Sequence, residues 1–439
     1  MTTLFLDRYV YRGDAALLFE PATGLRQALD PIADEMVREL VEGVGVSAVA
    51  ARMASTYDVP AAEIEADIND LLCQLREASA DGTSTGTGGP DPEKALGKPP
   101  AAPFALELEL TRHCDWACSF CYNVWKAKRP GQKPPETIHL PADLACSVLD
   151  SAAGMTVLRV RYSGGEPTMH PEFDRILTHG AALGLYQVLF TNGRTLNRET
   201  ARRWKDWNVR EVMLSLHGNE PSHDALTLRK GSWRRTMNAI GAAIDNGLEV
   251  VVEMTVTSGN VSDVLDVLKT VKSMGGREFR LMRYVPTGRR DEELAPPEGI
   301  LADLIAQLEQ EDEGSLPRVQ FPCSPRFCLS EPLAPLTDSD VLKLREKYLV
   351  PHCAAGINWA SVSHDGKLRI CPHSDRYLGD LSQPGASLPA LWRDSVQPSA
   401  VAALERNERS CGSCPALAIC RGGCHLAQFT STAKTPARF

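Results

Sequence analysis

The sequence predicts an α/β protein whose main domain is a partial barrel of six strand–helix units. Apolar strand patterns alternate with amphipathic helical patterns six times through the middle of the chain. This alternation is typical of parallel strands covered by helices. A complete barrel of this kind has eight units, so six units indicate an incomplete one. A small acidic domain precedes the repeat, and a cysteine-rich segment follows it.

The expected barrel strands are short and rich in apolar residues. They cover 104–111, 157–162, 186–191, 211–216, 249–257 and 278–284. The expected helices between them cover 141–153, 171–183, 198–207, 233–246 and 261–274. In barrels of this type the functional residues lie at the C-terminal ends of the strands, so the loops that follow the strands are where a site is expected.

The N-terminal segment, residues 1–82, predicts two strands followed by three helices. The strands are expected at 3–12 and 15–20, and the helices at 31–42, 46–56 and 61–78. This order is that of a winged helix-turn-helix domain. The segment holds fifteen Asp and Glu against six Arg and no Lys, a net charge of 6 − 15 = −9. Nucleic-acid binding needs a basic surface, so we expect no nucleic-acid partner.

The domain boundaries follow from composition. Residues 83–102 are rich in Gly, Ser, Thr and Pro, which predicts a flexible linker. The barrel is expected at 103–295, a bridging region at 296–350 and the cysteine-rich domain at 351–439.

No stretch has the length of a membrane span, and the N-terminus lacks the features of a secretory signal. Thirteen cysteines without export indicate metal or redox chemistry in the cytoplasm. We therefore expect a cytoplasmic protein without a membrane partner.

Three cysteines stand in the loop after the first expected strand. Cys114, Cys118 and Cys121 are separated by three and then two residues, and the aromatic Phe120 precedes the last. Three thiolates can hold three irons of a four-iron cluster and leave the fourth iron open to a ligand. A structural zinc site is the alternative, but it usually combines two pairs of closely spaced cysteines.

The stretch from Ser163 to Pro167, after the second expected strand, completes this pattern. Gly164 and Gly165 allow the backbone to approach a ligand, and Glu166 supplies an acceptor for an ammonium group. With the three cysteines, this stretch resembles the radical S-adenosylmethionine (radical SAM) superfamily. The resemblance implies that SAM chelates the open iron of a 4Fe–4S cluster. One electron would then cleave SAM to methionine and a 5′-deoxyadenosyl radical.

The resemblance implies roles for further residues. Gly164, Gly165 and Glu166 would hold the amino group of SAM, and Phe120 is also expected at the cofactor. Ser215 and Arg229 would contact its ribose or carboxylate, and Thr257 would lie near it. The alternative for these last three is a strand-end hydroxyl or a solvated arginine. The electron would come from a donor such as flavodoxin or ferredoxin.

Six cysteines near the C-terminus form a second pattern. They are Cys353, Cys371, Cys411, Cys414, Cys420 and Cys424, with Gly366 between the first two. Their spacing resembles the SPASM domain, which carries auxiliary iron–sulfur clusters in radical SAM enzymes that modify peptides. A zinc ribbon formed by the last four cysteines is the alternative.

The SPASM resemblance implies two auxiliary clusters. Cys353, Cys371 and Cys424 would ligate the nearer cluster, and Cys411, Cys414 and Cys420 the farther one. Each cluster is then one protein ligand short. Cys323 and Cys328 are candidate ligands of the nearer cluster. A carboxylate, another residue or an open iron would complete the farther cluster.

The N-terminal domain resembles the PqqD-like recognition element of ribosomal-peptide (RiPP) pathways, in which a leader peptide adds a strand to a sheet edge. Together, these resemblances imply an enzyme that binds a precursor peptide. By hydrogen abstraction it would form a thioether or a carbon–carbon or carbon–oxygen cross-link.

Two alternatives stay open. One is an anaerobic sulfatase maturase, which forms formylglycine. Such enzymes lack the N-terminal module and place an Asp directly after the cysteine that matches Cys371, where this chain has Pro372 and carries Asp375 further on. The other, of a different class, is a metal-bearing winged-helix regulator that binds DNA.

Overall fold

The computed structural model divides into two compact units, Met1–Ala102 and Pro103–Phe439. It describes residues 9–11, 16–20, 25–29, 31–41, 44–80, 102–123, 138–285, 292–297, 299–312, 314–322, 347–348, 355–357, 359–374 and 376–399. Nearly all of the predicted linker, 83–102, lies outside these residues. Each unit has its own hydrophobic core.

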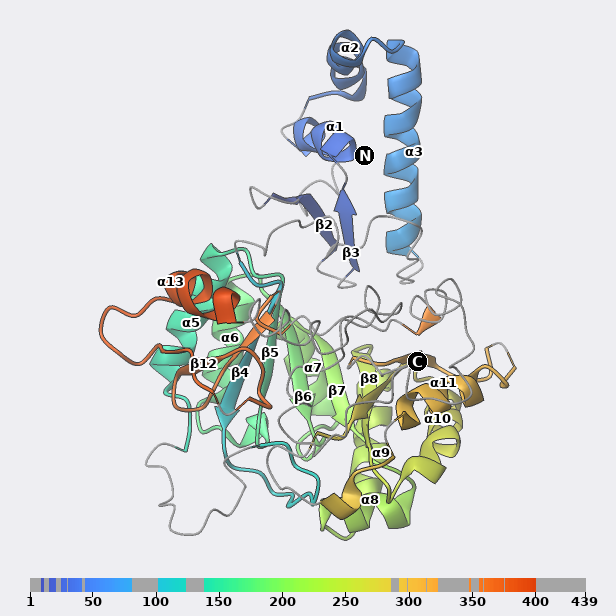
Figure 1. The fold of residues 1–439 in the computed structure, drawn as a ribbon, viewed down its shortest axis with the longest axis vertical. Coiled ribbons are helices and arrows are strands. Elements are labelled where there is room, and N and C mark those ends of the chain that lie inside the picture. Colours follow the sequence, from blue (N-terminus) through green and yellow to red (C-terminus); the bar gives the residue numbers. More distant parts are fainter. Residues whose placement is uncertain are drawn as a thin grey trace, which may run out of the picture. The chain divides into compact units, whose positions relative to one another are not determined.

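The N-terminal unit contains a three-stranded antiparallel sheet (Figure 1). Its strands, in spatial order, are β1 (Tyr9–Tyr11), β2 (Ala16–Glu20) and β3 (Leu25–Leu29). β2 confirms the strand predicted at 15–20, and β1 is the described part of the one predicted at 3–12. β3 is an additional strand. It is five residues long and includes Arg and Gln, so its apolar signal is weak.

Three helices follow the sheet. They are α1 (Pro31–Val41), α2 (Val46–Tyr57) and α3 (Ala61–Ala80), which confirm the three predicted helices. Val37, Val49, Met53 and Ile68 are buried between them, because apolar residues three and four positions apart lie on one helical face. The finer winged helix-turn-helix assignment stays a prediction.

The second unit contains a mixed ten-stranded sheet, and six parallel strands form its centre. In order they are β4 (Ala105–Thr111), β5 (Arg159–Gly164), β6 (Tyr186–Thr191), β7 (Val209–Ser215), β8 (Glu249–Val256) and β9 (Glu278–Arg283). All six predicted strands are confirmed. Each strand pairs with the next along the chain, so the six C-terminal ends lie at one edge.

The sheet extends beyond the six predicted units. β10 (Arg318–Gln320) adds a parallel strand beside β9, and β11 (Trp359–Val362) adds one beside β4. The antiparallel strands β12 (Lys367–Arg369) and β13 (Gly379–Asp380) follow β11. The first part of the cysteine-rich segment therefore continues the barrel sheet.

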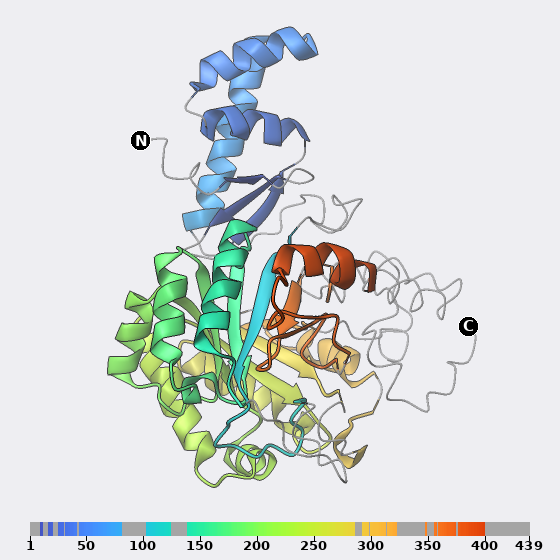
Figure 2. The same ribbon diagram turned by 90° about the vertical axis from the view of Figure 1, so that its left-hand side faces the viewer.

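Helices alternate with the central strands and cover one face of the sheet (Figures 1 and 2). They are α5 (Ala142–Gly154), α6 (Phe173–Ala182), α7 (Arg198–Asp206), α9 (Ser232–Asp245), α10 (Val264–Ser273) and α11 (Ile300–Leu308). The first five confirm the predicted helices. α8 (Glu220–Thr227) is a helix that was not predicted. Its start is fixed by Asn219, which caps the N-terminus.

Short elements complete the unit. They are the turns η3 (Pro167–Met169), η4 (Val261–Asp263) and η5 (Glu292–Leu294), α13 (Leu388–Leu391) and η7 (Trp392–Val396). Within the described part of the chain, no helix combines the length and apolar character needed to cross a membrane.

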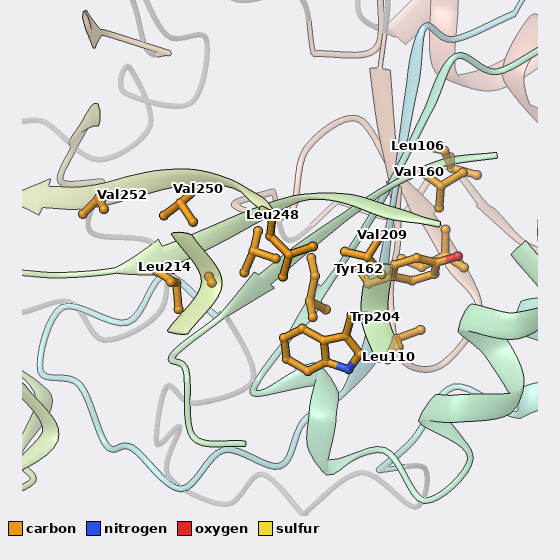
Figure 3. Packing of buried hydrophobic residues seen from close by; sticks show 14 of the residues in the cluster. Leu106, Leu110, Val160, Tyr162, Trp204, Val209, Leu214, Leu248, Val250 and Val252 are labelled. Carbon is orange, nitrogen blue, oxygen red and sulfur yellow. The ribbon is translucent and has the colours of Figure 1, made fainter. Parts of the chain in front are cut away.

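The main core lies between the sheet and its helices. Alternate strand residues such as Leu106, Val160, Leu214 and Val252 point into it and are fully buried, as Figure 3 shows. Because side chains alternate between the faces of a strand, the intervening residues lie on the opposite, inner face of the sheet. Many of these are charged, so the two faces differ sharply in polarity.

Candidate active site

The three cysteines of the first motif lie in the loop that directly follows β4. Cys114, Cys118 and Cys121 are all half-buried. The Sγ atom of Cys114 accepts a hydrogen bond from the backbone N–H of Trp116 at 3.4 Å. Among the described residues, no three His, Cys, Asp or Glu side chains surround a position for a single metal ion. An iron–sulfur cluster has a different requirement, because each cysteine binds a separate iron.

This cysteine loop is fastened to the end of α8 by main-chain hydrogen bonds. Ala117 N–H donates to the carbonyl of Thr227 at 3.2 Å, and Ser119 N–H donates to that of Leu226 at 2.9 Å. Phe120 packs on Leu226 and on the ring of His217, with ring centroids 4.5 Å apart. The unpredicted helix α8 therefore supports the loop.

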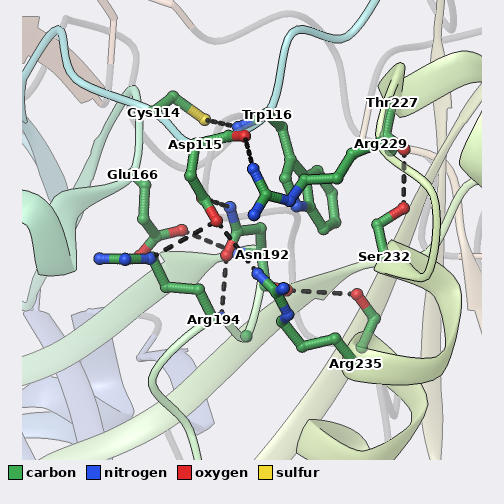
Figure 4. A network of polar contacts seen from close by, with 12 residues as sticks. Cys114, Asp115, Trp116, Glu166, Asn192, Arg194, Thr227, Arg229, Ser232 and Arg235 are labelled. Atoms are coloured by element: carbon green, nitrogen blue, oxygen red, sulfur yellow. Dashed lines mark hydrogen bonds and ion pairs between the residues drawn. The ribbon is translucent and has the colours of Figure 1, made fainter.

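Asp115 is the centre of a polar network that holds the same loop (Figure 4). Its carboxylate accepts a hydrogen bond from the side-chain amide of Asn192 at 2.8 Å. It also lies 3.1 Å from Arg235 and 3.5 Å from Arg194. Its backbone carbonyl accepts a hydrogen bond from Arg229 at 2.9 Å. The residue after Cys114 is thus anchored from β6, α9 and the end of α8.

Gly164 and Gly165 bring the end of β5 against the start of the cysteine loop. Gly165 N–H donates to the carbonyl of Thr111 at 2.6 Å, and Glu166 N–H donates to that of His113 at 2.6 Å. A Cβ atom on Gly165 would lie 2.1 Å from the carbonyl oxygen of His113. Gly164 has a φ of 129°, which favours glycine. The close approach shown here is to the protein backbone, and the predicted approach to SAM stays a prediction.

Glu166 joins the ends of β5 and β6. Its buried carboxylate accepts hydrogen bonds from the backbone and hydroxyl of Thr168, the hydroxyl of Thr191 and the backbone of Asn192. Burial raises the pKa of this carboxyl group, while these donors act in the opposite direction. A carboxylate has about four lone-pair sites. Three of the donors act on Oε1 and one on Oε2, so among the described residues one lone pair of Oε2 is left for a further donor such as an ammonium group.

The other predicted cofactor residues lie around the same edge. Ser215 is half-buried at the end of β7. Arg229 is exposed and anchors the cysteine loop through the carbonyl of Asp115. Thr257 is fully buried, and its hydroxyl donates to Asn260 at 3.1 Å. The structure accounts for Arg229 and Thr257 through protein contacts, and their roles toward SAM stay predictions.

Cys371 is the described member of the second cysteine pattern. It follows β12, and its turn lies beside the cysteine loop, because the ring of His373 stacks on Tyr122 with centroids 4.4 Å apart. Arg369 donates to the carbonyls of Pro372 and Ser374 at 3.1 Å. The predicted ligands outside the described residues are Cys323, Cys328, Cys353, Cys411, Cys414, Cys420 and Cys424.

A fully buried ion pair fixes this turn to the barrel. Arg369 pairs with Glu109 on β4, and neither side chain is exposed. β4 continues into the loop of Cys114 to Cys121, and β12 continues into the turn of Cys371. The ion pair therefore joins the two strands that lead into the cysteine segments.

Two family profiles match the chain. The profile described as the Radical SAM superfamily matches residues 108–271, which contain the cysteine loop, Glu166 and the strands that carry them. The chain carries a radical SAM domain. The profile described as Coenzyme PQQ synthesis protein D (PqqD) matches residues 16–80, so the N-terminal unit is a PqqD-like domain.

The radical SAM family implies a SAM cofactor and one 4Fe–4S cluster, and the site fits both. Its cysteine loop offers three thiols with no disulfide among the described cysteines. The loop is held on two sides by α8 and by the Asp115 network.

Relatives of this chain include enzymes that are named for different reactions. The mycofactocin maturase MftC of Mycobacterium ulcerans is 28% identical over 341 residues, which cover 75% of this chain and 84% of that protein. The AdoMet-dependent heme synthase of Nitratidesulfovibrio vulgaris is 23% identical over 341 residues, which cover 74% and 88%.

Streptococcus suis SuiB bound to its precursor peptide SuiA has a similar fold. The TM-score is 0.65 at 15% identity, over 97% of this chain and 95% of SuiB. The fold likeness therefore extends over nearly the whole chain.

Sequence reasoning assigned no role to three residues that build the site. Asp115, Asn192 and Arg235 form the network behind the cysteine loop. Asp115 stands directly after Cys114, and Asn192 stands directly after a predicted strand. These positions suggest a functional role. A polar residue in a loop can, however, equally be explained by its contact with water. Arg235 has no comparable signal, because it lies on an amphipathic helix with many charged residues.

Proposed function

We propose that this protein is a radical SAM enzyme that modifies a ribosomally made precursor peptide. The observation that carries the proposal is the joining, in one chain, of a radical SAM domain and a PqqD-like domain. Relatives named mycofactocin maturase and PqqA peptide cyclase support it. The fold likeness to SuiB in complex with its precursor peptide also supports it.

Some of the described residues would hold the cofactors, and others support or cover the loop that carries the cysteines. Cys114, Cys118 and Cys121 would hold the cluster, which with SAM supplies a 5′-deoxyadenosyl radical. Asp115 and the end of α8 fix the loop that carries these thiols. Phe120, packed on His217, shields one side of the loop from water.

The PqqD-like domain would bind the leader peptide. β1 and β3 each pair only with β2 among the described strands, and a free strand edge can accept an extended peptide. The flexible linker predicted at 83–102 would let the bound peptide reach the barrel. The reaction would be hydrogen abstraction followed by thioether, carbon–carbon or carbon–oxygen cross-link formation.

The C-terminal segment would hold two auxiliary iron–sulfur clusters in a SPASM domain. Of the predicted ligands of this set, Cys371 lies in the described part of the chain, and its turn lies next to the cysteine loop. Such a position suits electron transfer between a substrate and a second cluster. A flavodoxin or ferredoxin in the cytoplasm would supply the electron that starts the reaction.

A sulfatase-maturase activity is less well supported. The fold of anSMEcpe covers 75% of this chain with a TM-score of 0.56, so a quarter of the chain has no counterpart there. In this chain, Pro372 occupies the position of the Asp expected after the Cys371 cysteine. SuiB, in contrast, covers 97% of the chain.

The test is anaerobic incubation of the reconstituted enzyme with SAM, a reductant and the short peptide encoded beside its gene. The proposal predicts a peptide that has lost a pair of hydrogens and an equal amount of 5′-deoxyadenosine. The same core peptide with a scrambled leader is the control, and it should be modified far more slowly. Deoxyadenosine formation without any change in the peptide, with either leader, would contradict the proposal.

A further inference from the structure

The inner face of the barrel sheet carries charged residues below the cysteine loop, and most of them have a described partner. Arg159 and Arg280 contact Glu211, Arg318 contacts Glu278, Arg369 contacts Glu109, and Glu107 accepts a hydrogen bond from Ser163. These charges are therefore neutralised or hydrogen-bonded within the protein.

Among the acidic side chains of this face in the described part of the chain, Glu253 on β8 is the exception. In the sheet register it lies between Ser215 on β7 and Arg280 on β9. Within the described part of the chain, its carboxylate accepts no hydrogen bond and has no cation within ion-pair distance. This is unexpected, because an arginine stands directly opposite it.

Arg280 does not pair with Glu253 because its guanidinium group is engaged elsewhere. Its Nε atom donates to Gln320 at 3.0 Å, and one Nη atom contacts the sulfur of Met213 at 3.1 Å. The other Nη atom lies 3.7 Å from the carboxylate of Glu211. These three contacts draw the cation away from Glu253.

The Glu253 side chain lies on the inner, polar face of the sheet. It is only half-buried, yet loss of water raises the pKa of its carboxyl group to about 7. Glu107 acts in the same direction, while Arg280 and Arg161 oppose it.

We propose that Glu253 binds a cationic side chain of the substrate peptide, a lysine ammonium or an arginine guanidinium, inside the barrel. The inference rests on the proposed function. A half-buried carboxylate without a described partner is costly, and a charge-assisted hydrogen bond to a cation offsets that cost. An anionic group would instead be repelled by both Glu253 and Glu107.

The location makes this contact a determinant of which carbon reacts. Glu253 lies one strand away from Ser215, which is expected at SAM. A cationic group held by Glu253 would place the carbon chain of the same residue toward the cofactor. Arg161 is the other cation of this face to consider, and it forms no ion pair with Glu253. It stands on β5, three strands away from β8, and its guanidinium lies 5.7 Å from the centre of the Trp359 ring.

The test uses two small probes with the reconstituted full-length enzyme. One is N-acetyl-lysine methylamide deuterated on its side-chain carbons, and the other is the equally deuterated norleucine compound, which lacks the ammonium group. Deuterium transferred to 5′-deoxyadenosine is measured by mass. Since a hydrogen bond to a charged group contributes about 1.5–3 kcal/mol, we expect at least a roughly tenfold preference for the lysine probe.

Matched variants assign the preference to Glu253. Glu253→Gln should bring the ratio between the probes close to one. Glu249→Gln, on the same strand and the same face, should keep it, because Glu249 is held by Tyr186 at the other end of β8. The preference of the wild-type enzyme should also grow as the pH rises through about 7, where Glu253 loses its proton.

Three outcomes would overturn the inference. They are equal transfer from both probes with the wild-type enzyme, an unchanged preference in Glu253→Gln, and a loss of SAM binding in Glu253→Gln without any probe. The last outcome would assign Glu253 to the cofactor. Absence of deoxyadenosine under all conditions would instead refute the proposed function itself.

Discussion

The carboxylate of Asp115 accepts a hydrogen bond from the side-chain amide of Asn192 at 2.8 Å. This contact joins the residue beside Cys114 to the end of β6. Asn192 N–H in turn donates to Glu166 at 2.8 Å, so one short chain of contacts links the cysteine loop, β6 and the Gly-Gly-Glu stretch. The two sequence motifs are thus parts of one rigid edge of the sheet.

Asp115→Asn should loosen the cysteine loop. Asparagine is nearly isosteric but loses the charge that faces Arg235 and Arg194. We expect the free energy of unfolding of the larger unit to fall by about 1–3 kcal/mol, with less iron retained after reconstitution. Urea denaturation and iron analysis would measure both.

The control for Asp115 is Asp174→Asn, which removes an exposed pair with Arg203. Their side chains are 61% and 44% exposed, and such pairs contribute about 0–1 kcal/mol. Equal effects of the two substitutions would show that the Asp115 network does not support the site.

Gly165→Ala should disrupt the packing of β5 against the cysteine loop. The added Cβ atom would lie 2.1 Å from the carbonyl oxygen of His113 and 2.6 Å from its carbon. Both are backbone atoms, so relief requires movement of the loop, at a cost of about 1–3 kcal/mol or more. We expect iron retention to fall well below the wild-type level.

Gly154→Ala is the matched control, because a Cβ atom at that end of α5 meets no atom within 4 Å. It should leave both stability and iron content close to wild type. If Gly165→Ala also retained full iron content, the close approach would be unimportant for the cluster loop.

The Glu109–Arg369 ion pair should show strong energetic coupling. Both side chains are fully buried, and removing one partner of such a pair costs about 3–5 kcal/mol. The double variant Glu109→Gln/Arg369→Met should cost less than the sum of the single variants, because no isolated charge is left. A double-mutant cycle measured by urea denaturation gives this difference.

The exposed pair of Arg234 and Glu220, with side chains 73% and 45% exposed, serves as the comparison. Its coupling should be within about 1 kcal/mol. Coupling of the same size for the buried pair would mean that Arg369 acts only through its bonds to the turn of Cys371.

Glu253 should make stability depend on pH. Burial raises its pKa from 4.5 to about 7, so the folded protein binds this proton more tightly than the unfolded chain. Stability therefore falls as the pH rises from about 4.5 through about 7, by at most about 3 kcal/mol for this group.

Glu253→Gln removes this contribution and should flatten the profile. Urea denaturation at several pH values measures the slope, and the exposed Glu172→Gln serves as the control. Part of the slope will persist, because burial also raises the pKa values of Glu107 and Glu166. Parallel profiles for the wild type and Glu253→Gln would contradict a raised pKa of Glu253 in the folded protein.

The central strands could be predicted because the pattern that identifies each one lies within a few consecutive residues. Leu106, Leu108 and Leu110 alternate with Glu107 and Glu109 at the period of a strand, and each helix repeats apolar residues at the helical period. α8 and β3 were missed because both are short. α8 begins at a single Asn cap, and β3 is stabilised by pairing with β2 and not by its own sequence.

The cofactor chemistry of the site could be predicted from the sequence. The contacts that hold the cysteine loop in place could not. The cysteine spacing and the Gly-Gly-Glu stretch are visible as patterns, whereas the contacts of Asp115 with Arg235 and of Glu109 with Arg369 join residues more than a hundred positions apart. Single-sequence patterns contain no information on such pairs. That no described cation pairs with Glu253 likewise depends on how Arg280 is oriented in three dimensions.

The central claim is that Cys114, Cys118 and Cys121 hold the cluster that cleaves SAM. The direct measurement is 5′-deoxyadenosine formed from SAM by the anaerobically reconstituted enzyme with a reductant. It is compared with the variant in which all three cysteines are alanine. We predict deoxyadenosine from the wild-type enzyme and none above background from the variant. Equal formation by both proteins, or none by either, would contradict this account.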